Sequence, residues 1–413
     1  MLHRPRLALA FLFVLLGCGG AGGNQAVAQE GARPFAMTQV GDFEEPWAIA
    51  FMADGRALVT EKRGELKIWR PGGEVIDVAG VPEVAADGQG GMLDVALAPD
   101  FAHSRLVYLS YAEPGEGGSG LALGRGRLVE ADGAARIEDF RVLWRQLPRG
   151  AGGHFGAIIA FAPDGRSLFL SAGERQRFLP AQDPDQATGK ILHLTLDGQP
   201  APDNPMAGRT VAATVAVIDP PRDHVVAQEA PARRVTLDAP NLNPAATWTS
   251  GHRNPYGLAF APDGRLWAHE MGPRGGDEFN LIERGRNYGW PLVSEGENYN
   301  GVAIPGHSTR PDLAPPALSW VPSISPSGLI FYGGDMFPAW RGDALMGALS
   351  GQALLRIEIE GASAREADRW DLGMRIRDVA EAPDGSVFLL EDGGRGAQGR
   401  LFRLTPAAAG QGA

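Results

Sequence analysis

The chain has 413 residues, of which 57 are glycine and 32 are proline, and only 21% of the residues are charged. This profile is typical of many short strands joined by tight turns, in several small domains or in one large closed β architecture. The net charge of −11, without a concentrated basic stripe, argues against a nucleic-acid partner.

The first segment, residues 1–30, is predicted to be an export signal followed by a glycine-rich tether. Basic side chains precede an apolar run over residues 7–16, which is too short for a permanent membrane anchor. Two cleavage sites fit this segment: a small-x-small site that ends at Ala28, and a sequence resembling a bacterial lipobox that ends at Cys18. We expect an exported, periplasmic protein, either free or lipid-anchored to a membrane through Cys18.

An internal repeat dominates the rest of the chain. Five segments share an apolar run, an Asp followed by Gly or Phe, and a second apolar run, and they begin with AIAFMADG at Ala48, DVALAPDF at Asp94, IIAFAPDG at Ile158, GLAFAPDG at Gly257 and DVAEAPDG at Asp378. The Asp-Gly pair predicts a tight turn between two half-buried strands, because Asp accepts backbone N–H groups and Gly supplies a positive φ. A sixth, weaker unit begins at Ser327 and has an expanded turn.

Several units continue into further strands, as over residues 64–70, 189–198 and 399–405, so each unit has about four strands. Units of this kind placed around an axis make a β-propeller, which protects sheet edges by radial repetition. We predict an all-β fold, a six-bladed β-propeller with four-stranded antiparallel blades, as a single domain over 36–408. The stretch over 203–247 has no turn signature and is predicted to be an insertion.

Several polar residues stand beside the predicted strands. His154 lies in a glycine-rich turn just before a strand, which places its imidazole at one rim of a propeller, and a neutral imidazole is the usual proton acceptor near pH 7. Arg253 and Asn254 lie in a turn ahead of another strand. Arg375 and Arg377 alternate along a strand and so share a face. Each also has an ordinary interpretation, as a structural loop histidine or as solvent-exposed polar groups.

The most informative stretch is GHRNPYGLAFAPDGRLWAHEMGPRGGDEFNLIERGRNYGWP, from Gly251 to Pro291. Together with HFGAIIAF at His154 and GQGGMLDVALAPDF at Gly88, it closely resembles the glucose/sorbosone dehydrogenase family. Members of this family are soluble, calcium-requiring quinoprotein propellers that oxidise aldoses. The resemblance covers nearly the whole chain after the export signal, and its motifs are far more specific than a lone glycine fingerprint.

The resemblance implies a role for individual residues. It implies that His154 is the general base and that Glu174, after the following strand, orients it. The positions that match the family's pyrroloquinoline quinone (PQQ) site are Gln89, Arg253, Asn254, Arg375 and Arg377. Guanidinium groups suit the carboxylates of this quinone, because Arg pairs bidentately with carboxylates and keeps its charge.

Calcium is implied at two places. Gly272 and Pro273 match positions whose main-chain carbonyls hold the ion that bridges to the quinone, and hard cations prefer such oxygen ligands. Glu278 and the Tyr288 carbonyl resemble part of a second, structural calcium site. The alternative for Glu278 is a solvated acidic turn.

Two departures from the family pattern put cofactor affinity and substrate range in question. Ser350 stands where relatives often have a lysine, so one cation near the quinone is missing. Ala157 and Ile158 replace a glycine and an arginine of the first motif.

The activity implied by the resemblance is oxidation of an aldose at its anomeric C1 to a lactone, with hydride transfer to PQQ. An electron acceptor then reoxidises the quinol, and the protein is a monomer or a homodimer. Two alternatives come from other classes. One is a non-catalytic propeller that binds a sugar or a protein. The other is a calcium-dependent lactonase, which needs a central cluster of acidic and Asn ligands that the spaced basic residues do not provide.

Overall fold

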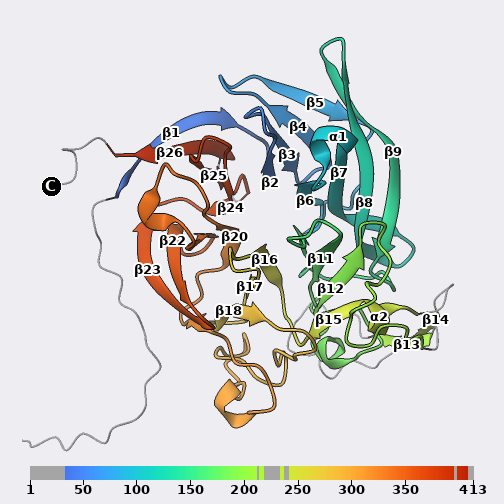
Figure 1. Ribbon diagram of the computed structural model, residues 1–413. Coiled ribbons are helices and arrows are strands. Elements are labelled where there is room, and N and C mark those ends of the chain that lie inside the picture. Colours follow the sequence, from blue (N-terminus) through green and yellow to red (C-terminus); the bar gives the residue numbers. More distant parts are fainter. Residues whose placement is uncertain (1–32, 212–213, 218–232, 237–240, 395–397, 408–413) are drawn as a thin grey trace, which may run out of the picture.

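The computed structural model describes residues 33–211, 214–217, 233–236, 241–394 and 398–407. Over these residues the protein is an all-β propeller, and Figure 1 shows the sheets arranged radially around a common centre.

The first two sequence repeats form one sheet. In spatial order its strands are β2 (Pro46–Phe51), β3 (Ala57–Glu61), β4 (Glu65–Trp69), β5 (Val75–Ala79), β9 (Ala134–Arg145), β8 (Gly118–Ala131), β7 (Leu106–Gly115) and β6 (Met92–Leu97). The two halves are antiparallel throughout and join through a parallel β5–β9 contact, in which Val78 pairs with Ala135 and Ala79 with Arg136. The first two units therefore share one eight-stranded sheet, because β9, the outer strand of the second unit, pairs with β5, the outer strand of the first.

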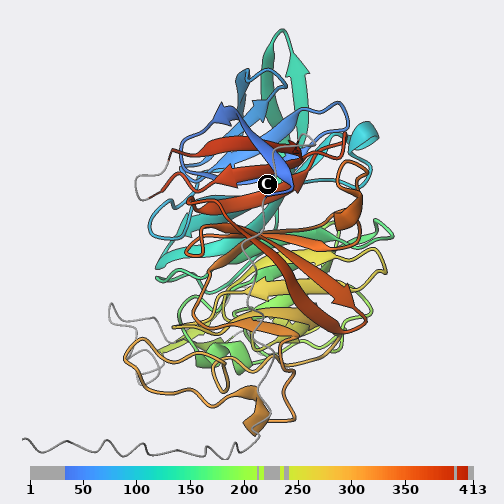
Figure 2. The same ribbon diagram turned by 90° about the vertical axis from the view of Figure 1, so that its left-hand side faces the viewer.

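The other repeats form four-stranded antiparallel sheets. Their strands are β10 (Gly156–Phe161), β11 (Ser167–Ala172), β12 (Lys190–Thr195) and β15 (Thr247–Ser250); β16 (Pro255–Phe260), β17 (Leu266–Glu270), β18 (Asp277–Ile282) and β19 (Leu318–Trp320); β20 (Pro326–Phe331), β21 (Ala344–Ala348), β22 (Ala353–Glu360) and β23 (Ser363–Asp371); and β24 (Ile376–Glu381), β25 (Val387–Glu391), β26 (Arg400–Pro406) and β1 (Phe35–Asp42). The last sheet pairs the first of the described strands with the last, and Figure 2 shows β1 in blue beside the red C-terminal strands.

The predicted turns have the expected chemistry. Asp54, Asp164, Asp263 and Asp384 each accept the backbone N–H of the residue two positions later, at 3.0 to 3.1 Å. The glycine that follows each Asp has a φ between +68° and +85°. In the second unit Phe101 replaces the glycine, and the turn becomes the short helix α1 (Phe101–Ser104).

The inner strands β2, β6, β10, β16, β20 and β24 contact one another in ring order. Hydroxyl groups strengthen these contacts: Thr60, Ser110 and Ser171 donate to carbonyls of the next inner strand at 2.6, 2.6 and 2.9 Å. Asp94 and Asp378 accept a backbone N–H of the next unit at 2.7 and 2.9 Å. Because Asp378 bonds to β2, this contact closes the ring.

A cavity of about 360 Å³ lies between the inner strands, and residues from all six of them line it. Trp47, Tyr256 and Arg377 line it near the starts of their strands, and the rings of Trp47 and Tyr256 meet edge to face at 5.8 Å. Arg377 therefore stands where the axial cavity meets the rim that carries the predicted site.

The predicted insertion over 203–247 contains a two-stranded sheet, β13 (Thr214–Val217) with β14 (Arg233–Thr236), and the short helix α2 (Asn243–Ala246). The other helical turns among the described residues are η1 (Leu179–Gln182), η3 (His307–Thr309) and η4 (Pro338–Trp340). None of the helices in the described part of the chain has the length and apolar character to cross a membrane.

Candidate active site

The predicted base and its carboxylate meet at one rim of the propeller. His154 precedes β10 and Glu174 follows β11, and because these strands are antiparallel the two ends lie together. His154 Nδ1 lies 2.5 Å from Glu174 Oε1, and both side chains are buried. Burial disfavours the charged carboxylate, but the hydrogen bond from His154, the charge of Arg253 and the hydrogen bond from the Phe178 N–H outweigh it, so the pKa of Glu174 is lowered. An ionised carboxylate only accepts hydrogen bonds, so in the neutral imidazole Nδ1 carries the proton and Nε2 carries the lone pair.

A fully buried arginine, which sequence reasoning missed, holds the loop that carries His154. The guanidinium of Arg175 donates to the carbonyls of Gly152 and Gly153 at 2.7 and 3.0 Å and lies 3.9 Å from the centre of the Phe155 ring. The only signal in the sequence is its position directly after Glu174. Arg175 ties the glycine-rich loop to the strand end that carries the orienting carboxylate.

Strained backbone is concentrated around the same pair. His154, Ala157, Arg175, Gln176 and Phe178 have φ between +52° and +89°, and they are five of the eleven non-glycine residues in this conformation in the described part of the chain. Each such residue costs roughly 1 to 3 kcal/mol, and such strain clusters at functional sites. Ala157, which stands where the family has glycine, thus adopts a conformation that glycine prefers.

The side chain of Gln89 contacts the backbone of the predicted base. Its Oε1 accepts the N–H of His154 at 2.7 Å. A Cβ added at Gly153 would lie 2.7 Å from that amide, so a larger residue there would have to displace the Gln89 side chain. The structure therefore places Gln89 beside His154.

Arg253 and Asn254 lie in the turn before β16, which is hydrogen-bonded to the segments that carry His154 and Glu174. The Arg253 carbonyl accepts the N–H of Glu174 at 2.9 Å, and Asn254 Oδ1 accepts the N–H of Gly156 at 3.3 Å. The Arg253 guanidinium donates to the carbonyl of Gly272 at 2.6 Å, so one predicted calcium ligand is already in contact with a predicted quinone ligand. Arg253 Nε is buried without a hydrogen-bond partner among the described residues.

Arg375 and Arg377 form a second cationic group and share one carboxylate, Asp392. Arg375 Nε lies 2.8 Å and Arg377 NH2 lies 2.9 Å from its oxygens. Burial opposes ionisation of Asp392, but the charge of Arg377 and the hydrogen bonds outweigh it and lower its pKa. Sequence reasoning missed Asp392, which follows β25. The two arginines and Asp392 together thus carry a net charge of about +1.

Ser350 lies on the exposed surface beyond β21. Its hydroxyl donates to Ser325 Oγ at 2.8 Å. Two arginines are candidates to replace the cation that is missing at Ser350. Arg274 is exposed and lies 3.2 Å from Glu297, and Arg395 lies outside the described residues.

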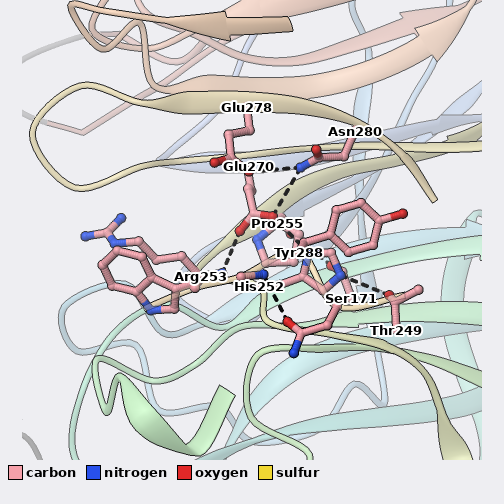
Figure 3. Close-up of polar contacts among 12 residues, drawn as sticks. Ser171, Thr249, His252, Arg253, Pro255, Glu270, Glu278, Asn280 and Tyr288 are labelled. Carbon is pink, nitrogen blue, oxygen red and sulfur yellow. Dashed lines mark hydrogen bonds and ion pairs between the residues drawn. The ribbon is translucent and has the colours of Figure 1, made fainter. Parts of the chain in front are cut away.

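Glu278 belongs to a buried polar cluster at the base of the fourth unit (Figure 3). It lies opposite Glu270 in the β17–β18 pairing, and Asn280 Nδ2 donates to both carboxylates at 3.2 and 3.4 Å. Burial and the charge of Glu270 raise the pKa of Glu278 well above its ordinary value. His307 Nε2 lies 3.1 Å from the Tyr288 carbonyl, which joins this predicted ligand to the cluster.

Asn280 Oδ1 is buried without a hydrogen-bond partner among the described residues. An acceptor of this kind beside two buried carboxylates suits a hard cation. Among the described residues, no three His, Cys, Asp or Glu side chains converge closely enough to hold a metal ion by themselves. Any cation here therefore needs amide or main-chain oxygens as well.

The fold and this rim define a β-propeller with a histidine–carboxylate pair beside a set of guanidinium groups. The family model "Glucose / Sorbosone dehydrogenase" matches residues 43–217 and 227–403. The protein therefore belongs to the glucose/sorbosone dehydrogenase family, as its motifs predicted.

Individual relatives agree with this assignment. The aldose sugar dehydrogenase YliI of Escherichia coli K12 is 39% identical over 373 residues, which cover 88% of this chain and 90% of the relative. The apo-form crystal structure of the soluble aldose sugar dehydrogenase from Escherichia coli has a TM-score of 0.76 at 37% identity and covers 90% of this chain and 100% of that chain. The PQQ-bound aldose sugar dehydrogenase from Streptomyces coelicolor has a TM-score of 0.66 at 25% identity, covering 91% and 99%.

Proposed function

We propose that this protein is a PQQ-dependent aldose dehydrogenase that oxidises the anomeric C1 of an aldose to a lactone. The observation that carries the proposal is the His154–Glu174 pair, buried beside the Arg253–Asn254 turn at one rim of the propeller. Family membership and the PQQ-bound relative from Streptomyces coelicolor support it.

The chain's own residues provide base catalysis. His154 Nε2 takes the proton of the anomeric hydroxyl, and Glu174 stabilises the imidazolium that forms. Arg175 and Gln89 hold the His154 loop in place through its main chain. Quinone bound in this site would supply the hydride acceptor, since the redox chemistry belongs to the cofactor.

The donor set fits a quinone with several carboxylates. Arg253 has an orphaned Nε, and Arg375 and Arg377 share a single counter-charge, so positive charge remains at the rim. These three guanidinium groups and Asn254 would hold the cofactor through charge-assisted hydrogen bonds. They also stabilise negative charge that develops beside them during the reaction.

We propose calcium at both places that the family resemblance implies. The Gly272 and Pro273 carbonyls would hold one ion next to the quinone. Glu278, with the Tyr288 carbonyl, would hold a second, structural ion, and the orphaned Asn280 oxygen supports this.

The test of the function is reconstitution. Adding PQQ and calcium to purified apoprotein should change the quinone absorption spectrum, and adding an aldose should then reduce an artificial electron-accepting dye. If the quinone does not bind at all, the non-catalytic sugar- or protein-binding propeller becomes the better interpretation.

Ser350→Lys should tighten quinone binding. Relatives often have a lysine here, and a charge-assisted hydrogen bond contributes about 1.5–3 kcal/mol, which corresponds to roughly 10- to 150-fold in affinity. The measurement is a quinone titration of calcium-loaded apoprotein, wild type against variant. Ser350→Gln controls for the longer side chain without the charge. Equal or weaker binding by the lysine variant would show that Ser350 does not face the cofactor.

We further propose that the propeller has six four-stranded blades, with the eight-stranded sheet counted as two. The ring of six inner strands supports this count, and the β-ladder between the halves of the large sheet pairs only two residues of β5 with two of β9. The blades would form a single domain over 36–408, in a monomer or a homodimer.

Export and a lipid anchor at Cys18 complete the proposal; residues 1–30 lie outside the described residues. If Cys18 is lipidated, the wild type should fractionate with membranes, and Cys18→Ala should be released or left unprocessed. Mass spectrometry of the mature N-terminus is the direct measurement. A mature chain that begins at Gln29 would instead indicate a free periplasmic protein.

A further inference from the structure

The fourth sequence repeat contains a second histidine–glutamate pair, His252 with Glu270. Like His154, His252 precedes an inner strand, and like Glu174, Glu270 lies where the second strand of the same sheet ends. His252 Nδ1 lies 2.8 Å from Glu270 Oε1. The same arrangement thus occurs twice, in neighbouring units.

The second pair is not placed for proton transfer to a substrate. His252 is 0% exposed, its Nε2 lies 2.9 Å from the hydroxyl of Thr249, and its ring stacks on Tyr288 with centroids 4.8 Å apart. Both ring nitrogens are therefore engaged inside the protein. His252 therefore has no nitrogen available to take a proton from a substrate.

Glu270 instead holds the backbone of Arg253. Its Oε2 accepts the Arg253 N–H at 2.5 Å, while Oε1 remains with His252. Figure 3 shows Glu270 between Asn280 on one side and the His252–Arg253 turn on the other. The carboxylate is 4% exposed, so this hydrogen bond does not compete with water.

The two residues after Glu270 hold the other end of Arg253. The carbonyls of Met271 and Gly272 accept hydrogen bonds from its guanidinium at 2.9 and 2.6 Å. One three-residue segment therefore fixes both the main chain and the charged end of this arginine. A long side chain held at both ends loses little further conformational entropy when it binds a ligand.

We propose that His252 and Glu270 are positioning residues that fix Arg253 for binding the quinone. The proposal rests on the proposed function, because it takes Arg253 as a cofactor ligand. His252 keeps the carboxylate turned toward the Arg253 N–H, and the carboxylate sets the conformation of the turn. The pair is the structural counterpart of the His154–Glu174 pair, with the histidine turned inward.

The first experiment compares quinone affinity in variants of Glu270, with calcium-loaded apoprotein titrated with PQQ and followed by absorbance. Glu270→Met removes the acceptor and should raise the quinone Kd by about 10- to 100-fold, the range found when the hydrogen-bond partners of metal ligands are removed. Glu270→Gln keeps an oxygen for the Arg253 N–H and should raise the Kd less than Glu270→Met does. Unchanged binding by a folded Glu270→Met protein would overturn the proposal.

A double-mutant cycle separates positioning from general damage. In an Arg253→Met background there is no guanidinium to position, so adding Glu270→Met should not weaken quinone binding further. Additive losses would show that Glu270 acts on the site by another route, and the proposal would be wrong. Wild-type protein that binds no quinone would instead contradict the proposed function.

The matched control is Glu366→Met. Glu366 is also a buried carboxylate, and it accepts the indole N–H of Trp320 at 2.7 Å on the outer part of a different sheet. Thermal melts should show that both Met variants lose stability, but only the Glu270 variant should lose quinone affinity. If Glu270→Met does not fold, Thr249→Val removes only the partner of His252 Nε2 and should still raise the Kd; an unchanged Kd in that variant would count against the proposal.

Discussion

Replacing His154 with alanine is expected to lower kcat by about two to four orders of magnitude, the usual contribution of a positioned general base. The fold and the quinone affinity should change little, because Glu174 keeps the hydrogen bond from the Phe178 N–H and Arg175 still holds the glycine-rich loop. The measurement is steady-state turnover of an aldose by reconstituted protein, with quinone occupancy checked by absorbance.

The control for this prediction is His193→Ala. His193 is also buried, but it stacks on Phe169 in the third unit and bonds to Asn204 and Ser167, away from the rim. This variant should lose stability and keep its turnover. Near-normal kcat in a fully loaded His154→Ala protein would remove His154 from the mechanism.

The second large effect is expected at the arginine pair. Arg375→Met and Arg377→Met should each weaken quinone binding by roughly 10- to 150-fold, the loss of one charge-assisted hydrogen bond. The double variant should bind more than about 1,000-fold more weakly, because Asp392 would then face the quinone carboxylates without a counter-charge. Quinone titration of calcium-loaded protein measures each step.

Asp392 provides the internal check. Adding Asp392→Asn to the double variant removes the repulsion and should recover part of the lost affinity. Arg356→Met is the matched control, because Arg356 lies on β22 and pairs with Asp343 and Asp368, outside the rim. If the double variant binds quinone as tightly as the wild type, the pair does not contact the cofactor.

The contact between Arg253 and the Gly272 carbonyl links the two predicted ligand sites. The first calcium would share this carbonyl with the guanidinium, since both are cations that prefer the same oxygen. Binding of calcium at the Gly272 carbonyl is therefore expected to affect the position of the Arg253 guanidinium, and the reverse. The segment from Glu270 to Gly272 is the part of the chain through which this coupling would act.

Interactions between residues close in sequence made the strands and turns of this protein predictable from its sequence. Each Asp-Gly turn is closed by atoms two residues apart, as at Asp263, so the turn and its flanking strands follow from adjacent residues. The repetition of that signal indicated a propeller. The positions of His154 and Arg253 before inner strands then followed, because a turn at the start of a strand must lie at a rim.

Only the tertiary structure decided how the charges pair. Three features depend on distances between separate turns and strands. Two arginines share Asp392, Arg175 bonds to the His154 loop, and two repeats join through β5 and β9. The second histidine–glutamate pair is likewise invisible in the sequence. His252 and His154 stand in equivalent places, but both ring nitrogens of His252 are bonded inside the protein, whereas His154 lies beside the rim, where we propose that it acts as the base. Such outcomes follow from packing between elements, which local patterns do not encode.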